Sequence, residues 1–301
     1  MAHKDTGTPL ITLNRKQRDT WDFVKFVAPM FILYFIFFIL PLFQTVEYSF
    51  TSYNGINPKK NFIGLENYKT LFKDKLFYST LLFTAKSAGL LMVFANLIGF
   101  VLALALNRKI KSRTVLRAII FCPFIFNNVT VGFIWQFLLG RFMTELYPMT
   151  GLGVFKIGWL SDPKLVLYSV IFVKIWQSMG YFMAIYLAGL QLLPQEPIEA
   201  SIIDGCTGFQ KITKIVIPLM RPTIFVCVFL SITEALNMFP LLMTLTNGGP
   251  GHASQNISLY IYTEAFKSHR MAYASAMAVI LTIIMLIVTI FQQKLTKEVD
   301  L

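Results

Sequence analysis

Charged residues are scarce in this chain of 301 residues: they make up 14% of it, whereas 55% of the residues are hydrophobic. Soluble domains carry roughly 25% charged residues. The shortage excludes an ordinary soluble domain, and a mean hydropathy of +0.62 together with 29 phenylalanines indicates that lipid is the main solvent. A membrane helix needs about 20 apolar residues, so the chain has room for about six such helices and their loops.

Residues that build metal or covalent sites are equally scarce. The chain has only three cysteines and three histidines: Cys122, Cys206, Cys227, His3, His252 and His269. The cysteines are odd in number and lack CxxC spacing, which argues against a disulfide framework or a zinc site. The histidines lack ligand spacing too. We therefore expect no metal site.

The signatures of nucleotide binding and catalysis are also missing. No Gly-Lys dipeptide occurs in the 301 residues, whereas a phosphate-binding loop ends in Gly-Lys-Ser or Gly-Lys-Thr. No nucleophile elbow or catalytic dyad is recognisable. We predict that the chain is not an enzyme and binds no cofactor of its own.

Basic residues outnumber acidic ones and give a net charge of +12. In a soluble protein this excess would point to nucleic acid. Membrane proteins, however, concentrate lysine and arginine in their cytoplasmic loops, and that explanation fits the apolar composition better. We therefore predict contact with membrane lipid and none with nucleic acid.

Long apolar runs predict an all-α membrane protein with six transmembrane helices within residues 26–293. The runs are Phe26–Phe43, Ser87–Leu106, Ala118–Gly140, Leu165–Gln195, Pro222–Asn247 and Met271–Gln293. The fourth run is free of charge only after Lys174, and Glu234 interrupts the fifth. The first run is too long for a signal peptide and no small-x-small cleavage site follows it, so we expect a retained helix. Residues 1–25 and 294–301 are predicted to form terminal tails.

The orientation follows from lysine and arginine in the short loops. Residues 107–117 contain five basic side chains and no acidic one, which is typical of a cytoplasmic loop. Both termini and the loop Pro194–Arg221 then also face the cytoplasm. The opposite loop, Glu47–Tyr78, contains five lysines but also three acidic residues, so the bias rests mainly on the first loop.

Within Glu47–Tyr78, apolar residues from Leu65 to Leu76 recur at helical spacing and predict a short amphipathic helix. This helix either lies at the interface or, as we prefer, packs on the bundle as a lid.

The loop Pro194–Pro222 is long and partly apolar for a helix connection. Its segment Pro197-Ile198-Glu199-Ala200 has the proline and the early acid of a helix start. We expect Gly205 and Gly208 to end that helix, and a second amphipathic stretch to follow over residues 209–216. A short helix held between two spans is suited to docking a partner, or to resting on lipid; the pattern alone does not distinguish these readings.

The same loop resembles the EAA loop of ABC importer permeases. That loop has Glu-Ala-Ala, then Gly after three residues, then Ile-x-Leu-Pro after nine. Here the run is Glu199-Ala200-Ser201, Gly205 and Ile215-Val216-Ile217-Pro218, with the spacing kept, serine in place of the second alanine and isoleucine in place of leucine. GLENYKTLF from Gly64, IYLAGLQLLPQEPIEA before and into the loop, and TNGGP from Thr246 are similar to the sugar branch of the family, which includes the maltose and glycerol-3-phosphate permeases. The similarity covers nearly all of the chain after residue 25 and looks like the maltose-F-type member of the permease pair.

The resemblance implies a type I ABC importer permease in a bacterial cell membrane. Its partners would be a second homologous permease, two cytoplasmic ATPases that bind ATP and Mg²⁺, and an external sugar-binding protein. It implies that a coupling helix sits in a cleft of one ATPase and moves when the ATPases close, so that the membrane helices swing between inward-open and outward-open states. The residues assigned to this helix are Glu199, Ala200, Ser201, Asp204, Gly205 and Gly208.

Polar and aromatic residues at membrane depth are candidates for a substrate pathway, because sugars bind through hydroxyl hydrogen bonds and through stacking on aromatic rings. The candidates are Glu234, Asn237, Trp135, Trp176, Tyr181, Asn127, Asn128 and Phe239. Buried ionisable groups in membranes are functional hypotheses by default, but Glu234 also has a structural reading as the partner of Lys174. The structural reading of the two tryptophans is that they pack in the bundle or lie at the membrane interface. The structural reading of the asparagines is that they link helices to each other.

Deep positive charge bears on the substrate class. We expect Lys86 and Lys174 near the outer ends of their spans, where lysine reaches water, and no cation at the midplane. This favours a neutral sugar over glycerol phosphate or another anion, which remains the alternative. The outward segment Thr246–Gln255 contains a Gly-Gly-Pro turn; it either contacts the binding protein or closes the outer mouth, and we favour the second reading.

Two other classes compete with the importer. An ion-driven secondary transporter often shows inverted repeats and broken helices, and neither is recognisable in the sequence. A membrane sensor or scaffold would not need polar residues deep in several spans.

Overall fold

The computed structural model describes residues 15–57, 59–108 and 111–297. The predicted tail segments 1–14 and 298–301 lie outside the described residues. Helix α1, Arg15–Tyr34, and helix α15, Met271–Lys297, extend into the predicted tails 1–25 and 294–301. A helix does not end where the apolar run ends, because its backbone hydrogen bonds continue until a residue breaks them.

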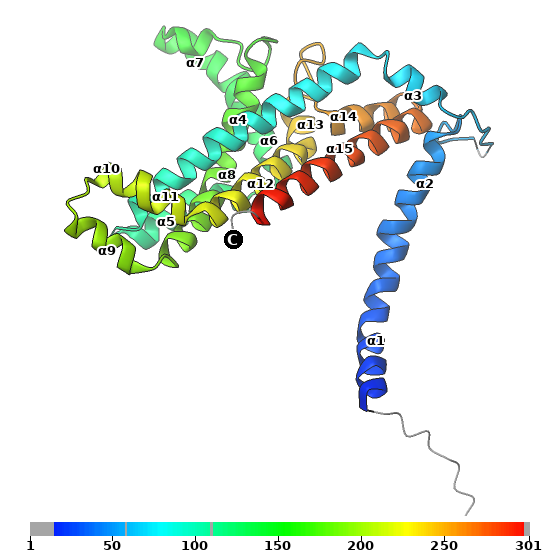
Figure 1. Ribbon diagram of the computed structural model, residues 1–301. Helices are drawn as coiled ribbons and strands as arrows, with labels where there is room; N and C mark the ends of the chain where they lie inside the picture. Colours follow the sequence, from blue (N-terminus) through cyan, green and yellow to red (C-terminus); the bar gives the residue numbers. More distant parts are fainter. Residues whose placement is uncertain (1–14, 58, 109–110, 298–301) are drawn as a thin grey trace, which may run out of the picture.

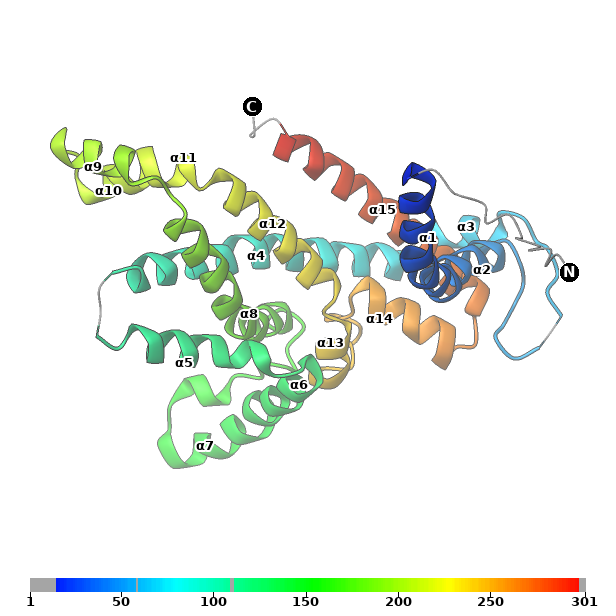
Figure 2. The ribbon, with the colours of Figure 1, turned by 90° about the horizontal axis from the view of Figure 1, so that it is seen from below.

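An all-helical bundle forms the body of the protein (Figures 1 and 2). In chain order, after α1, the elements are η1 Phe35–Ile39, α2 Leu40–Ser49, α3 Glu66–Leu71, α4 Lys75–Leu106, α5 Arg113–Ile125, α6 Asn128–Gln136, η2 Phe137–Phe142, α7 Met143–Thr150, η3 Gly153–Lys156, α8 Val166–Gln191, α9 Gln195–Ile203, α10 Gly208–Lys211, η4 Ile212–Val216, α11 Ile217–Leu219, α12 Arg221–Leu236, α13 Phe239–Leu245, α14 Ile257–Tyr262, η5 Thr263–Lys267 and α15. Here η3 is a 3₁₀ turn and the other η elements are π-helical.

Four helical stretches are long and apolar enough to cross a membrane alone: 23–49, 75–106, 166–191 and 271–291. Two bent pairs bring the number to six, in agreement with the predicted six-helix membrane fold. The first stretch runs straight through α1, η1 and α2. Its α2 end packs on α15, whereas α1 projects away from the bundle (Figure 1).

The third predicted span, Ala118–Gly140, is not continuous. Helix α5 ends at Ile125, and the chain turns by 92° before α6 begins. Phe126 and Asn127 are extended there, and the Asn127 side chain accepts a hydrogen bond from the amide of Val129, as an N-cap does. The expectation of unbroken helices is therefore wrong, because this asparagine starts a new helix instead of continuing the old one.

The fifth predicted span, Pro222–Asn247, is also divided. Helix α12 ends at Leu236, and α13 begins at Phe239 with Pro240 in its first turn. Before α12 the chain bends by 75° between Leu219 and Arg221, where the predicted turn at Pro218 and Pro222 lies. Proline has no amide hydrogen to donate, but amides in the first turn of a helix have no partner within the helix. A proline at these positions therefore costs no hydrogen bond.

The main core lies where α4 packs along α8, with α12 and α13 beside them. Glycines allow the close approaches: a Cβ atom on Gly99 of α4 would meet the Phe182 side chain of α8, and one on Gly180 of α8 would meet the backbone of α5. Small residues at such crossings are the usual means of packing membrane helices.

A second core joins α3, α14 and α15 at the end of the bundle that lies opposite α9–α11 (Figure 2). The predicted helix from Leu65 to Leu76 is shorter than expected, because Asp74 caps α4 by accepting a hydrogen bond from the amide of Leu76 at 2.8 Å. Leu71 of α3 is fully buried against the bundle, which favours the lid reading. The other Asp74 carboxylate oxygen accepts hydrogen bonds from Tyr260 at 2.5 Å and Tyr273 at 2.6 Å.

Candidate coupling loop and translocation site

The candidate coupling helix is α9, which is separated from the end of α8 by three residues. Gly205 ends it in a left-handed conformation with φ of +74°, which favours glycine. Thr207 then caps α10 through a reciprocal capping box with Gln210. The predicted helix, break and second stretch are all present in the structure.

Most of the assigned coupling residues face away from the bundle. The exposed positions among them are Glu199, Ala200, Asp204, Gly205 and Gly208. Ser201 differs: it is 3% exposed, and its hydroxyl donates to the carbonyl of Ile198 at 2.6 Å. We therefore read Ser201 as the inward contact of α9, and Glu199 and Ala200 as the accessible surface of that helix. Asp204, Gly205 and Gly208 are exposed positions of the turn after α9 and of the start of α10.

A buried ion pair lies deep in the bundle. The Lys174 ammonium of α8 is 2.5 Å from the Glu234 carboxylate of α12, and Lys174 is only 2% exposed. The same ammonium is 3.3 Å from the side-chain oxygen of Gln177 and 3.4 Å from that of Asn128. Three oxygen acceptors from three helices thus surround one buried cation.

This finding corrects the expected position of Lys174. It does not lie at the end of its span in contact with water, because α8 begins at Val166 and places Lys174 in its third turn. A charge is retained there because an opposite charge and polar oxygens replace its hydration. Lys86 is also not at the end of its span, because α4 begins at Lys75 and places Lys86 in its fourth turn, but unlike Lys174 its side chain is exposed on the bundle surface.

A cavity of about 460 Å³ opens beside the ion pair. Its lining residues are Phe124, Ile125, Phe126, Asn127, Asn128, Lys174, Gln177 and Glu234. The break between α5 and α6 forms one wall, and the amide of Gln177 donates to the carbonyl of Phe126 at 3.0 Å, which satisfies a backbone group that the break leaves free. The cavity offers charged, amide and aromatic groups, which is the combination that binds a hydroxylated ligand.

The structure brings together only some of the predicted pathway residues. Asn127, Asn128 and Glu234 line the cavity. Tyr181 stacks on the lining residue Phe124 with ring centroids 4.4 Å apart. Gln177, which the sequence analysis missed, is a glutamine one helical turn after Lys174 and would have been found by asking which polar residue shares its face.

The remaining candidates lie outside this cavity. Trp135 and Trp176 contact each other edge to face with centroids 5.3 Å apart, which favours their packing reading. Phe239 packs on Tyr262. Asn237 follows the end of α12 and is exposed. These four positions are not brought to the site.

The segment Thr246–Gln255 is held by its own hydrogen bonds. Ser254 is fully buried, and its hydroxyl bonds to the hydroxyl of Thr246 at 2.8 Å and to the carbonyl of Gly249 at 2.5 Å. Such a loop has little freedom, which favours the reading of a rigid closure over an adaptable contact surface.

Comparison with known proteins agrees with this architecture. Residues 95–300 match the family of the binding-protein-dependent transport system inner membrane component. The chain is 35% identical over 273 residues to the probable starch degradation products transport system permease protein AmyD of Thermoanaerobacterium thermosulfurigenes, covering 91% of this chain and 93% of that one. It is 32% identical over 290 residues to the multiple sugar-binding transport system permease protein MsmF of Streptococcus mutans, covering 96% and 100%.

A solved structure shares the fold. A chain from the crystal structure of a bacterial ABC transporter involved in the import of the acidic polysaccharide alginate aligns with a TM-score of 0.81 at 22% identity, over 94% of this chain and 98% of that one. The overall fold of this chain, including the break between α5 and α6, is therefore compatible with the fold of an ABC transporter chain. The chain belongs to the family of inner-membrane permease components of binding-protein-dependent ABC importers.

Proposed function

We propose that this chain is a permease subunit of an ATP-driven importer of sugars or oligosaccharides, and that it forms the translocation pathway with a second, homologous permease. Two of its relatives are named for transport of starch degradation products and of multiple sugars. The observation that carries the proposal is the exposed helix α9, joined directly to a helix that lines a polar cavity. A permease that is driven by a partner ATPase needs a docking surface whose movement reaches the ligand cavity. Here α9 supplies the surface, and α8, which precedes it, lines the cavity.

Energy comes from partner chains in this proposal. Two cytoplasmic ATPases bind ATP and Mg²⁺, and one of them holds α9 through the face that contains Glu199 and Asp204. An external binding protein delivers the sugar, and both termini lie in the cytoplasm, as the basic loop 107–117 supports. The exposed apolar stretch 23–49 leaves surface for lipid and for the second permease.

The substrate is a neutral sugar. The cavity contains a deep cation, contrary to the sequence prediction, but Glu234 neutralises Lys174 at 2.5 Å. The side-chain nitrogen of Asn128 then remains to donate to a sugar hydroxyl, and the stacked Tyr181 and Phe124 provide an aromatic surface beside it. An importer of glycerol phosphate is the alternative, and it would use Lys174 as the anion partner.

Purification of the tagged chain in mild detergent, followed by mass spectrometry, tests the assembly. We expect a second six-span permease and an ATPase to copurify. The chain recovered alone, and still moving substrate across vesicles without ATP, would overturn the proposal. Competition separates the substrate classes: neutral oligosaccharides should inhibit uptake, and glycerol phosphate should not.

A further inference from the structure

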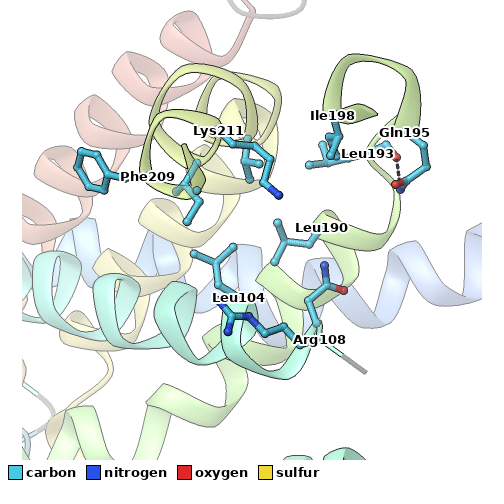
Figure 3. A pocket seen from close by; sticks show the side chains of 12 residues that line it. Leu104, Arg108, Leu190, Leu193, Gln195, Ile198, Phe209 and Lys211 are labelled. Atoms are coloured by element: carbon cyan, nitrogen blue, oxygen red, sulfur yellow. Dashed lines mark hydrogen bonds between the residues drawn. The ribbon is translucent and has the colours of Figure 1, made fainter. Parts of the chain in front are cut away.

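A second cavity lies under the coupling loop, away from the polar site. It has a volume of about 530 Å³. Figure 3 shows its walls: the ends of α4 and α8 on one side, and α9 with α10 on the other. This cavity shares no lining residue with the polar site, and of the residues assigned to coupling only Gly208 lines it.

The position of the cavity matches the boundary between hydrocarbon and headgroups. The two candidate spans that form its lower wall end at Leu106 and Gln191. Leu104 and Leu190 line the cavity just inside those ends, and Arg108 lines it just beyond. A lipid at this depth would have its acyl chains at the leucines and its headgroup at the arginine.

The charge of the cavity is of one sign. Arg108 from the end of α4 and Lys211 from α10 approach it from opposite walls (Figure 3). None of the twelve lining residues, all of them within the described part of the chain, is acidic. Within the same described residues neither cation has an ion-pair partner, so both remain able to bind an anion.

We propose that this cavity binds an anionic phospholipid, with its phosphate between Arg108 and Lys211 and an acyl chain along Leu104, Leu190 and Val216. Basic pockets between membrane helices are suited to acidic headgroups. A free phosphate would satisfy the two cations but would leave the apolar wall uncovered. A phospholipid satisfies both parts of the cavity at once.

A loop of the ATPase fits less well than a lipid. The two faces of α9 differ: Ile198 lines the cavity, whereas Ile203 is 86% exposed on the accessible side with Glu199. The accessible side is the one available for docking. The cavity lies behind the helix, at the depth of the span ends, where lipid is the abundant neighbour.

Such a lipid would connect the membrane helices to the coupling loop. Its phosphate would link α4 to α10, which otherwise meet across an open space. Anionic lipid would then support transport by holding the loop at its working distance from the span ends. This inference goes beyond the proposed function and does not depend on which solute is carried.

Native mass spectrometry of the full-length chain in mild detergent tests the proposal, with phosphatidylglycerol and phosphatidylcholine of the same acyl chains as probes. The variant Arg108→Gln/Lys211→Gln should bind phosphatidylglycerol about 25-fold more weakly, because each cation near an acidic headgroup contributes about fivefold. The control Arg113→Gln/Lys214→Gln removes the same charge from exposed positions outside the lining and should bind as the wild type does. Arg108→Gln alone, at an exposed position, should weaken binding about fivefold even if the double variant fails to fold.

The other outcomes are distinct. Equal loss in both double variants would mean non-specific attraction and would overturn the site. Displacement of phosphatidylglycerol by millimolar inorganic phosphate would mean a soluble-anion site instead. Loss of the lipid on adding the ATPase, with a cross-link from position 211 to that ATPase, would assign the cavity to the partner protein. Lipid retention is measured without transport, so failure of sugar uptake would leave this result unaffected.

Discussion

The buried ion pair between α8 and α12 allows a prediction of definite size. Lys174 is 2% exposed and lies 2.5 Å from Glu234, whose side chain is 28% exposed. Removing one partner of a buried pair costs about 3–5 kcal/mol, because the other charge remains buried without compensation. Since the oxygens of Asn128 and Gln177 stay near the ammonium, we expect the low end of this range, about 3 kcal/mol, for Glu234→Gln.

A native cysteine makes this cost measurable. Cys227 lies on α12, seven residues before Glu234, and is fully buried. With Cys122 and Cys206 replaced by serine, the rate at which a maleimide labels Cys227 reports how often α12 separates from the bundle. If reclosing is faster than labelling, about 3 kcal/mol corresponds to roughly 100-fold faster labelling in Glu234→Gln.

Two comparisons decide whether charge is the cause. The double variant Lys174→Met/Glu234→Leu removes both charges and should label at close to the wild-type rate, because an apolar replacement of a buried pair is often neutral. Glu145→Gln breaks an exposed pair with Arg141 and should change nothing measurable. The reasoning is refuted if Glu234→Gln labels within threefold of wild type, or if the double variant labels as fast as the single one.

Three further perturbations test other parts of the molecule. Glu199→Arg should leave the chain inserted but reduce ATPase copurification and uptake, whereas Glu196→Arg in the first turn of the same helix should affect both less. Gly180→Ala should destabilise the bundle by about 2 kcal/mol or more, because its Cβ would overlap the backbone of α5; Gly89→Ala, which meets open space, should not. Burial opposes ionisation of Asp74, but hydrogen bonds from two tyrosines and two backbone amides outweigh it and hold its pKa below the ordinary 3.8. Its ionised form therefore stabilises the fold above that value and loses this effect as the pH falls through the lower folded pKa, so Asp74→Asn should flatten the decline in thermal stability between about pH 5 and about pH 3.

Each of these has a clear contrary result. Normal uptake by well-expressed Glu199→Arg would count against docking through α9. Equal melting temperatures for the two glycine variants would mean that α5 and α8 are not in close contact. An unchanged pH profile in Asp74→Asn would show that the tyrosine contacts do not depend on the carboxylate charge.

Composition and apolar runs were sufficient to predict the fold class and the six-helix plan. The loop motif was sufficient to predict α9, since proline, acid and glycine at those positions act on the local backbone. The positions at which helices end were harder to predict from the sequence. Asn127 lies in an apolar run, and whether an asparagine caps a new helix or links two helices depends on the neighbours that the fold supplies.

The site depended on contacts that sequence spacing does not encode. Lys174 and Glu234 are sixty positions apart in the sequence, and only the packing of α8 against α12 brings them together. The depth of Lys174 was misjudged because the charge-free part of its run begins after it, while the helix itself begins at Val166. A charged residue inside an amphipathic or apolar helix does not mark the end of that helix.

The connections of the coupling loop suggest which contacts at the site persist during transport. Helix α8 enters the loop and α12 leaves it, so both partners of the ion pair are attached to the same moving segment. Lys174 is seventeen residues before the end of α8, roughly 25 Å along a rigid helix. A displacement of α9 would therefore carry Lys174 and Glu234 together and preserve their contact. The contacts from Lys174 to Asn128 and from Gln177 to Phe126 join α8 to the broken span α5–α6, which has no such attachment, and we infer that these are the ones that change when the pathway opens.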